Sequence, residues 1–382
     1  MNDKADSRYQ FSIVRDRLHR HRDPYLDFVF GRHKFELPDA VQSIVREHPE
    51  LALKRCAPDE VEVFARTAVD FLSRTYGVEA SPSAILPTPG GRAALSTLAA
   101  TLISPGETVV VTEPGYPVFD RVAAQSHATV RSVTLDPDRG FDPALGSLAG
   151  DRGNAVRILA LNYPNNPTGA VPSSATISEM QLHLDADTIW FNDATYGPLT
   201  YGEQPFSLLS TDSAASGGLR ALELHSLAKL FPLGPLSASF LVGDEDLIAP
   251  IREYSDFAWS PMSALLLLVA RECLGQGEHV EQMREGLRER LARLSAVLSD
   301  LGFHCFPAQG GMYQLCRAPI SVGDRPVHGA DEAAEILLAD HHVAVVPFEV
   351  GPHAYVRFSA LYLAEELETL AGLGRGRRLV QS

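Results

Sequence analysis

Five short apolar runs constrain the fold of this chain more than any other feature of its sequence. They cover residues 108–111, 156–161, 188–191, 222–224 and 239–242, and stretches with helical, amphipathic spacing separate them. Each run is apolar on both faces, which is typical of a strand in the middle of a buried parallel sheet. The sequence therefore predicts an α/β fold with a mainly parallel sheet covered by helices.

Polar and turn-forming residues follow four of these runs. The first run leads into residues 113–116, the second into 162–169, the third into 192–193 and the fourth into 225–226. In an open parallel sheet, ligands bind beyond the carboxyl ends of the strands. We therefore expect the side chains of these four segments to meet in one site.

The remainder of the chain indicates a second, smaller domain. The length of 382 residues is more than one core usually spans. Residues 278–301 have the spacing of a long amphipathic helix, and short strand-like and helical pieces alternate after it. We predict an N-terminal arm (1–45) that contributes to the small domain and the cleft, a large domain (46–277) and a small α+β domain (278–382).

Charge and cysteine content exclude several classes of partner. A net charge of -15 argues against nucleic acid or an anionic membrane, because a polyanion would be repelled. The N-terminus lacks the apolar stretch of a secretory signal, and no run approaches a membrane span. The four cysteines show no CxxC spacing, which favours buried thiols in a reducing compartment. We expect a cytoplasmic protein with no metal site.

Three kinds of side chain at the ends of the apolar runs point to one cofactor. Lys229 supplies an amine, Asp193 a carboxylate, and Tyr196 and Asn166 supply neutral hydrogen-bond donors. Pyridoxal phosphate needs a lysine for its Schiff base, an acid for its pyridinium nitrogen and donors for its ring hydroxyl. The sequence therefore predicts pyridoxal phosphate as the cofactor.

Each of these residues also has an ordinary explanation when taken singly. A lone lysine such as Lys229 is usually a solvated surface group, and Asp193 could cap a turn or helix. Tyr196 could be a half-buried packing residue, and the Asn-Pro-Thr-Gly stretch around Asn166 could be a plain turn. The combination is much more specific than any member.

A second group of residues suits the cofactor's phosphate. Gly90, Gly91 and Arg92 precede a helix-like run, and the exposed amides of a helix N-terminus bind phosphate well. Ser226 lies three residues before Lys229, so a helical turn would place both side chains on one side. A Gly-Gly turn is also a common structural feature.

Two further residues are candidates for contacts with the cofactor ring and the substrate. Tyr116 could stack on the ring, or it could be an ordinary packing residue. Arg357 is flanked by apolar residues in a strand-like segment, so its charge requires an anion. The anion is either a substrate carboxylate held by both guanidinium nitrogens or the acid of a structural salt bridge.

Taken together, the chain resembles the fold type I pyridoxal phosphate enzymes of the class I/II aminotransferase group, over roughly residues 25–370. The resemblance implies an aspartate aminotransferase-like fold with a seven-stranded type of sheet, and a homodimer with shared active sites. It implies that Lys229 is the Schiff-base lysine, Asp193 the pyridinium partner and Ser226 a phosphate ligand. It further implies that Asn166 and Tyr196 donate to the ring hydroxyl and that Tyr116 stacks on the ring. It places the phosphate cradle at Gly90, Gly91 and Arg92, the carboxylate-binding arginine at Arg357, and parts of the substrate pocket at Gly31 and Tyr313.

The sequence departs from that family at three places. Ser237 stands where the family commonly has an arginine that binds the cofactor phosphate. Residues 55–58 contain no counterpart of the tyrosine that many relatives donate across the dimer interface. Phe348 stands where a glycine is common, and its ring would narrow the pocket. These departures suggest a specialised substrate or a diverted reaction.

The leading functional prediction is an aminotransferase-like enzyme of bacterial specialised metabolism. It would activate the α-carbon of an amino acid held by Arg357, with Lys229 as general base. The alternatives are γ-elimination or replacement with C–C bond formation on S-adenosylmethionine, and cyclisation or oxidation of an arginine-like substrate. Residues 113–121 are similar to aminocyclopropanecarboxylate synthases, and residues 229–232 resemble arginine-modifying enzymes. A catalytically silent sensor of an amino acid or of pyridoxal phosphate is the remaining alternative.

Overall fold

The computed structural model describes residues 10–30, 36–144, 155–215, 217–236, 238–374 and 378–381. Two predicted site residues, Gly31 and Ser237, lie outside the described residues. Within the described part of the chain, no helix combines the length and the apolar character that crossing a membrane requires.

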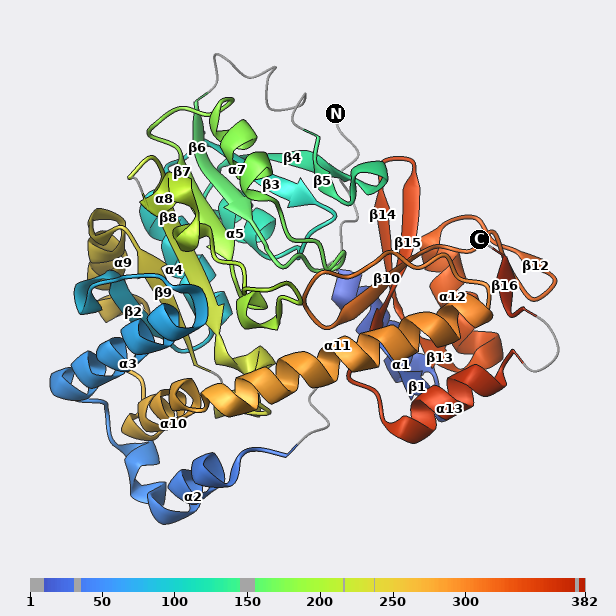
Figure 1. The fold of residues 1–382 in the computed structure, drawn as a ribbon, viewed down its shortest axis with the longest axis horizontal. Coiled ribbons are helices and arrows are strands. Elements are labelled where there is room, and N and C mark those ends of the chain that lie inside the picture. Colours follow the sequence, from blue (N-terminus) through green and yellow to red (C-terminus); the bar gives the residue numbers. More distant parts are fainter. Residues whose placement is uncertain are drawn as a thin grey trace.

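An eight-stranded sheet forms the centre of the large domain (Figure 1). Its strand order is β2-β9-β8-β7-β6-β3-β4-β5. The strands are β2 (Ile85–Thr88), β3 (Thr108–Glu113), β4 (Thr129–Asp136), β5 (Asp142–Pro143), β6 (Val156–Leu161), β7 (Ile189–Asp193), β8 (Arg220–Ser226) and β9 (Ser239–Gly243). All five apolar runs of the sequence coincide with strands, apart from Thr188, which directly precedes β7. Strands β3, β4, β6, β7 and β8 pair in parallel. The predicted α/β fold with a mainly parallel sheet is confirmed.

Strand β9 differs from this pattern, because it runs antiparallel to both β8 and β2. The connection from β8 to β9 covers only residues 227–238, and its described residues form short 3-10 turns. A parallel return needs a crossover of about a dozen residues or more, usually with a helix. The connection is twelve residues long, at the lower limit for such a crossover, and its described residues form no α-helix, so the chain returns in the antiparallel direction.

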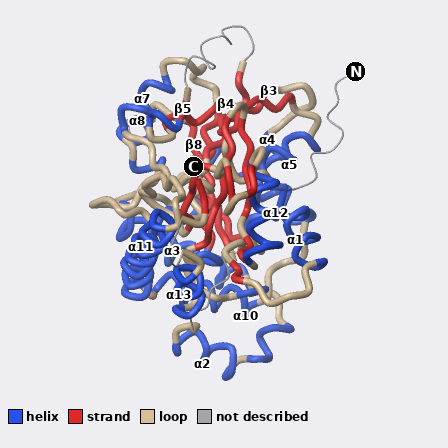
Figure 2. The backbone as a smooth tube through the Cα atoms, turned by 90° about the vertical axis from the view of Figure 1, so that its right-hand side faces the viewer, coloured by secondary structure: helices blue, strands red, loops and turns tan. Residues whose placement is uncertain are grey.

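Helices cover both faces of the sheet (Figure 2). Successive strand residues alternate between the two faces: Val109 packs with the cluster that includes α4 and α5, and Val110 packs with the cluster that includes α7. The helices of the large domain are α3 (Pro58–Tyr76), α4 (Gly91–Leu102), α5 (Phe119–Gln125), α7 (Ser174–Gln181), α8 (Asp212–Ala215), α9 (Glu245–Ala258) and α10 (Ala264–Gly275). Burial on both faces explains why these strands have apolar runs without alternation.

The long helix α11 (Gly277–Asp300) connects the large domain to the small one, as Figure 1 shows. The small domain holds a three-stranded antiparallel sheet in the order β10-β15-β14. Its elements are β10 (Tyr313–Arg317), β11 (Ser321–Val322), β12 (Arg325–Pro326), α12 (Ala330–His341), β13 (Val343–Ala344), β14 (Val346–Val350), β15 (His353–Ser359), α13 (Ala364–Gly372) and β16 (Val380–Gln381).

The N-terminal segment packs on the small domain. It comprises α1 (Gln10–Arg20) and β1 (Leu26–Asp27), and β1 pairs in parallel with β13. Phe28 is fully buried against the rings of Phe358 and Tyr362. Helix α2 (Asp39–Glu47) follows and lies against α10. The domain boundaries after residues 45 and 277 stay a prediction.

Candidate active site

A cavity of about 450 Å³ opens at the carboxyl ends of the central strands. Every predicted site residue within the described ranges lines it: Gly90, Gly91, Arg92, Tyr116, Asn166, Asp193, Tyr196, Ser226, Lys229, Tyr313 and Arg357. These residues come from seven separate segments of the sequence. The fold thus brings together the groups that the sequence spread over more than 260 positions, since 357 − 90 = 267.

Asp193 and Lys229 reach this cavity from neighbouring strands. Asp193 is the last residue of β7 and pairs with Leu224 of β8. Strand β8 ends at Ser226, and a single 3-10 turn over Leu227–Lys229 follows. Because β7 and β8 are parallel neighbours, their ends deliver the acid, the serine hydroxyl and the amine to one edge of the sheet.

The Asp193 side chain is half-buried and borders the cavity. Burial raises its pKa above the ordinary value, because a charged carboxylate loses hydration there. Hydrogen bonds from the Thr195 hydroxyl at 2.5 Å and the Thr195 amide at 3.2 Å oppose this shift. The positive charges of Lys229 and His225 oppose it as well. A cationic ligand group beside Asp193 would stabilise its charged form further.

Two tyrosines form a hydrogen-bonded pair in the wall of the cavity. The Tyr196 hydroxyl donates to the Tyr313 hydroxyl at 3.4 Å. Burial raises the pKa of Tyr196 well above its usual value, so this phenol keeps its proton. Burial also acts to raise the pKa of Tyr313, but the positive charges of Lys229 and Arg357 and the Tyr196 hydrogen bond lower it overall. Tyr313 is therefore the more acidic phenol of the pair.

Arg357 is placed in the cavity wall by β15, and its side chain is only 1% exposed. Its Nη1 donates to Asn166 Oδ1 at 2.8 Å, and its Nη2 donates to the carbonyl of Val29 at 2.7 Å. The guanidinium carbon lies 3.8 Å from the centroid of the Tyr313 ring and 5.1 Å from that of Phe11. Neutral oxygens and aromatic rings thus hold the guanidinium plane in one orientation.

The N-terminus of α4 forms the opposite end of the cavity. Gly90 precedes the helix with φ of 98°, a left-handed conformation that favours glycine, and no side chain caps the helix. A Cβ atom on Gly91 would lie 3.3 Å from Leu224 Cδ2 and 3.8 Å from Ser239 Oγ. Amide groups at an uncapped helix start are suited to an anion such as phosphate.

Two buried hydroxyls beside this helix start were missed by the sequence reasoning. Thr88 and Ser239 face each other in the β2–β9 register, and Ser239 also pairs with Ser226 of β8. The Thr88 and Ser239 hydroxyls are fully buried and have no hydrogen-bond partner among the described residues. The three hydroxyls form a row across β2, β9 and β8, and Ser226 of this row lines the cavity. The only sequence signal was hydroxyl residues at the ends of apolar strands.

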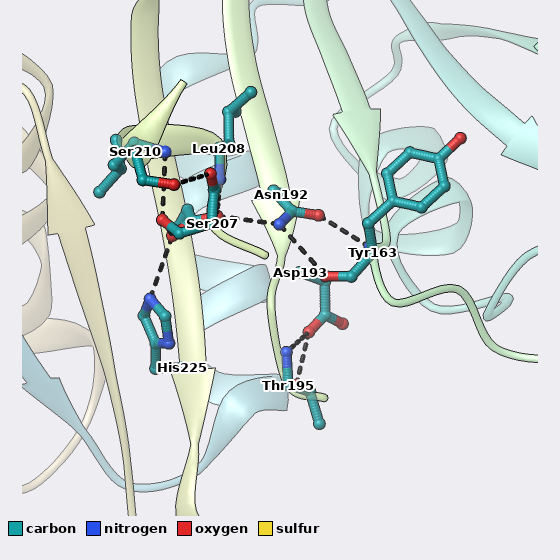
Figure 3. A network of polar contacts seen from close by, with 10 residues as sticks. Tyr163, Asn192, Asp193, Thr195, Ser207, Leu208, Ser210 and His225 are labelled. Atoms are coloured by element: carbon teal, nitrogen blue, oxygen red, sulfur yellow. Dashed lines mark hydrogen bonds and ion pairs between the residues drawn. The ribbon is translucent and has the colours of Figure 1, made fainter. Parts of the chain in front are cut away.

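A buried polar network supports the strand ends from the other face of the sheet (Figure 3). Glu223 of β8 is fully buried and accepts hydrogen bonds from Asn192 Nδ2 at 2.9 Å, Ser207 Oγ at 2.6 Å and the Leu208 amide at 2.7 Å. Its Oε2 also lies 3.2 Å from His225 Nε2. This network fixes β7 and β8 directly behind Asp193. The sequence reasoning missed it, although two polar residues within a buried apolar strand were its signal.

The N-terminal helix contributes two more residues that the sequence reasoning missed. Phe11 and Arg15 of α1 line the cavity, together with Val29 and Phe30. The sequence predicted only that the N-terminal arm lies across the cleft. Which face of α1 meets the cavity depends on how the helix packs on the small domain.

Phe348 lies beside the cavity rather than in its lining. Its buried ring is 5.9 Å from the Arg357 guanidinium carbon, and it lines a neighbouring cavity of about 820 Å³. The two cavities share Leu95, Tyr116, Asn162 and Asp193. The predicted roles of Gly31 and Ser237 concern residues outside the described ranges.

Comparison with known proteins identifies similar chains. The family model for aminotransferase class I and II matches residues 27–372. LL-diaminopimelate aminotransferase of Methanocaldococcus jannaschii is 26% identical over 372 residues, which covers 95% of this chain and 88% of that protein. Transaminase BacF of Bacillus subtilis is 28% identical over 304 residues, covering 78% of this chain and 74% of that protein.

Solved structures show the same fold. Substrate-bound BacF superposes with a TM-score of 0.84 at 24% identity, covering 97% of this chain and 94% of that one. A single mutant of aspartate aminotransferase from Thermus thermophilus superposes with a TM-score of 0.82 at 22% identity, covering 96% of each chain. The predicted aspartate aminotransferase-like fold of type I is confirmed.

Proposed function

Because this chain belongs to the class I and II aminotransferase family, whose enzymes use pyridoxal phosphate, we propose that it transfers the α-amino group of an amino acid to a keto acid. One observation carries the proposal. Lys229, Asp193 and the uncapped start of α4 line a single cavity at the carboxyl edge of the sheet. That cavity offers an amine, an acid and an anion site to one flat, phosphorylated ligand.

The residues present fit the cofactor. The Lys229 amine would hold it covalently, and Asp193 would face its ring nitrogen, where a cation would relieve the cost of the buried carboxylate. The start of α4 and the Ser226 hydroxyl would hold its phosphate. When bound, the cofactor supplies an electron sink for the α-carbon of an amino acid.

Arg357 is the proposed binding group for the substrate's α-carboxylate. Its planar guanidinium can donate to both oxygens of a carboxylate, and its contacts with Asn166 and Val29 hold it in place before a ligand arrives. The enclosing rings of Tyr313 and Phe11 exclude water from this charge. The low local dielectric strengthens the attraction between the guanidinium and a carboxylate bound here.

The proton transfers are assigned to residues beside this carboxylate site. Lys229 Nζ would take the proton from the α-carbon, which is the role expected of the family's lysine. Tyr196 keeps its own proton and acts as a hydrogen-bond donor, because burial raises its pKa. Tyr313, whose pKa is lowered by Lys229 and Arg357, is the partner that accepts from Tyr196.

The charges in the cavity favour a substrate whose side chain is neutral or anionic. Among the described lining residues, Asp193 is the only carboxylate, whereas Arg15, Arg92, Lys229 and Arg357 are cationic. Arg15 at the exposed rim would suit a distal carboxylate, as in the diaminopimelate named for one relative. An arginine-like substrate would find no acid other than Asp193 for its guanidinium in the described lining. Nothing in the described site favours S-adenosylmethionine.

We also propose that the protein is a homodimer. Leu53 has 93% of its surface exposed. It lies two residues before residues 55–58, where the resemblance to the family places the dimer interface. A single exposed leucine is ordinary on a protein surface, so the proposal rests on the resemblance to the family, and Leu53 marks the place where the interface would be tested. Analytical ultracentrifugation of the wild type and of Leu53→Glu would test this, with a monomeric wild type as the contradicting result.

The proposed reaction is tested by supplying amino donors and keto acids to purified enzyme loaded with pyridoxal phosphate. Mass spectrometry should detect the new amino acid, and a single-turnover reaction should convert the cofactor to pyridoxamine phosphate. Lys229→Ala should abolish both, whereas Arg293→Ala, which removes an exposed cation of α11, should leave both unchanged. Release of methylthioadenosine from S-adenosylmethionine without amino transfer would refute the proposal.

A further inference from the structure

Two cysteines of the small domain face each other across neighbouring strands. Cys305 and Cys316 form an isolated antiparallel bridge, and both are free thiols. The backbone bonds on either side join Arg317 N to His304 O and Phe306 N to Leu315 O, each at 2.9 Å. The cysteines therefore occupy a pair of positions that is not itself hydrogen-bonded, where facing side chains come closest.

The sulfur atoms are already near bonding distance. Cys305 Sγ and Cys316 Sγ are 3.0 Å apart, against about 2.05 Å in a disulfide. Directly opposed residues at such positions have Cα atoms about 4.5 Å apart, which lies within the range that a disulfide spans. A bond between the two sulfur atoms can therefore form without a change in the distance between the two backbone segments.

The two thiols differ in access and in acidity. Cys305 is half-buried, whereas Cys316 is completely buried. The hydrogen bond with Cys316 lowers the pKa of Cys305, although burial opposes this, and Ser299 and Ser295 add to the lowering. Burial raises the pKa of Cys316. Because the thiolate is the attacking species, Cys305 is the nucleophile and Cys316 the resolving thiol.

We propose that Cys305 and Cys316 are a redox modification site, which is oxidised reversibly to a disulfide by exchange with a small disulfide of the glutathione class. The Cys305 thiolate attacks one sulfur of the small disulfide, and one small thiol leaves. Cys316 then attacks Cys305 Sγ and expels the second small thiol. The two thiol protons end on the two released thiols, so atoms and electrons balance.

The bond would close the segment that brings an active-site ring to the cavity. Residues 306–315 include Tyr313, and the Gln309 amide donates to the carbonyl of Gly169 at 2.9 Å. Closing a short loop reduces the freedom of the unfolded chain. The oxidised protein should therefore show a higher thermal midpoint and slower amide exchange in 306–315 than the reduced protein. These readouts do not depend on the proposed transamination.

The other two cysteines provide matched controls. Burial, followed by the charge of Glu60, raises the pKa of Cys56, and burial raises that of Cys273 to about 12. Neither therefore favours a thiolate. They are expected to stay reduced under conditions that oxidise the pair.

The test uses full-length holoenzyme equilibrated in glutathione buffers of rising oxidised fraction, then alkylated with N-ethylmaleimide in denaturant. The number of alkylated cysteines should fall from four to two, and a peptide map should link Cys305 to Cys316. Dithiothreitol should restore all four. Cys316→Ser should accumulate glutathione on Cys305, whereas Cys56→Ser should behave as the wild type.

Several outcomes would overturn the proposal. The count could stay at four in fully oxidised glutathione, glutathione could persist on Cys305 of the wild type, or the linked peptide could contain Cys56 or Cys273. If Cys316→Ser fails to fold, the wild-type peptide map alone decides. Cys305→Ala then provides a second variant, which must lose the link and leave the buried Cys316 unmodified.

Discussion

Replacing Glu223 by glutamine should weaken the large domain and the cofactor site together. The buried carboxylate of Glu223 accepts from Asn192, Ser207 and Leu208, and it lies 3.2 Å from His225 Nε2. A carboxamide has one accepting oxygen in place of two, so its amide group would face at least one of these donors. Because the network lies directly behind Asp193, disorder here would also move the acid that the cofactor needs.

The size of the effect follows from the contacts that are lost. A hydrogen bond to a charged acceptor contributes about 1.5–3 kcal/mol. We therefore expect the free energy of unfolding to fall by about 1.5–3 kcal/mol for each hydrogen bond to Glu223 that the carboxamide cannot accept.

The pH dependence of this loss has a definite sign. Burial acts to raise the pKa of Glu223, but His225 and the hydrogen-bond donors lower it overall. A carboxyl group with a lowered pKa in the folded state stabilises the protein above its unfolded-state pKa. That stabilisation is lost as the pH falls through the lowered pKa. The difference in the free energy of unfolding between the wild type and the variant should therefore be largest at neutral pH and should become smaller in acid.

Urea unfolding of the cofactor-free proteins, followed by tryptophan fluorescence, measures this loss. Trp190 of β7 is only 2% exposed and reports on the neighbouring strand. Glu245→Gln is the matched control, because Glu245 also accepts from two hydroxyls, those of Ser81 and Ser83, but is exposed. The reasoning is refuted if Glu223→Gln loses no more stability than this control.

Three further variants test the site itself. Arg357→Lys loses one of two charge-assisted hydrogen bonds to a carboxylate, so kcat/KM for the amino donor should fall about 10- to 150-fold. Arg17→Lys is the control, and an unchanged kcat/KM in Arg357→Lys contradicts the assignment. Thr195→Val removes a hydrogen bond that lowers the pKa of Asp193, so the acid limb of the pH profile for kcat/KM should move to higher pH; a shift to lower pH would count against it. Ser239→Ala should weaken pyridoxal phosphate binding measured by equilibrium dialysis, and equal affinity would show that this hydroxyl does not serve the phosphate.

The sequence was sufficient to predict the sheet and most of the described site. The apolar runs predicted strands because burial on both faces leaves no room for polar residues, as in β6 and β7. Lys229 and Asp193 could be assigned because reactive side chains at the carboxyl ends of parallel strands lie at one edge of the sheet. The position of Arg357 was also expected, although its contacts with Asn166 and Val29 were not.

What the sequence did not predict depends on tertiary packing. The direction of β9 depends on its connection to β8, and the apolar run in β9 looks like the runs of the parallel strands. Arg15 reaches the cavity only because α1 packs on the small domain. Cys305 and Cys316 are eleven residues apart, and only the strand register brings their sulfur atoms together. The spacing of the two cysteines in the sequence does not determine which residues face each other across the strands.

The most direct test of the central claim is to reduce the enzyme loaded with pyridoxal phosphate with borohydride and to locate the attached cofactor by peptide mass spectrometry. The sequence contains four lysines, Lys4, Lys34, Lys54 and Lys229, so the result is unambiguous. We predict attachment at Lys229, with the label lost in Lys229→Ala. Attachment at another lysine, or no stable attachment to the loaded wild type, would contradict the account.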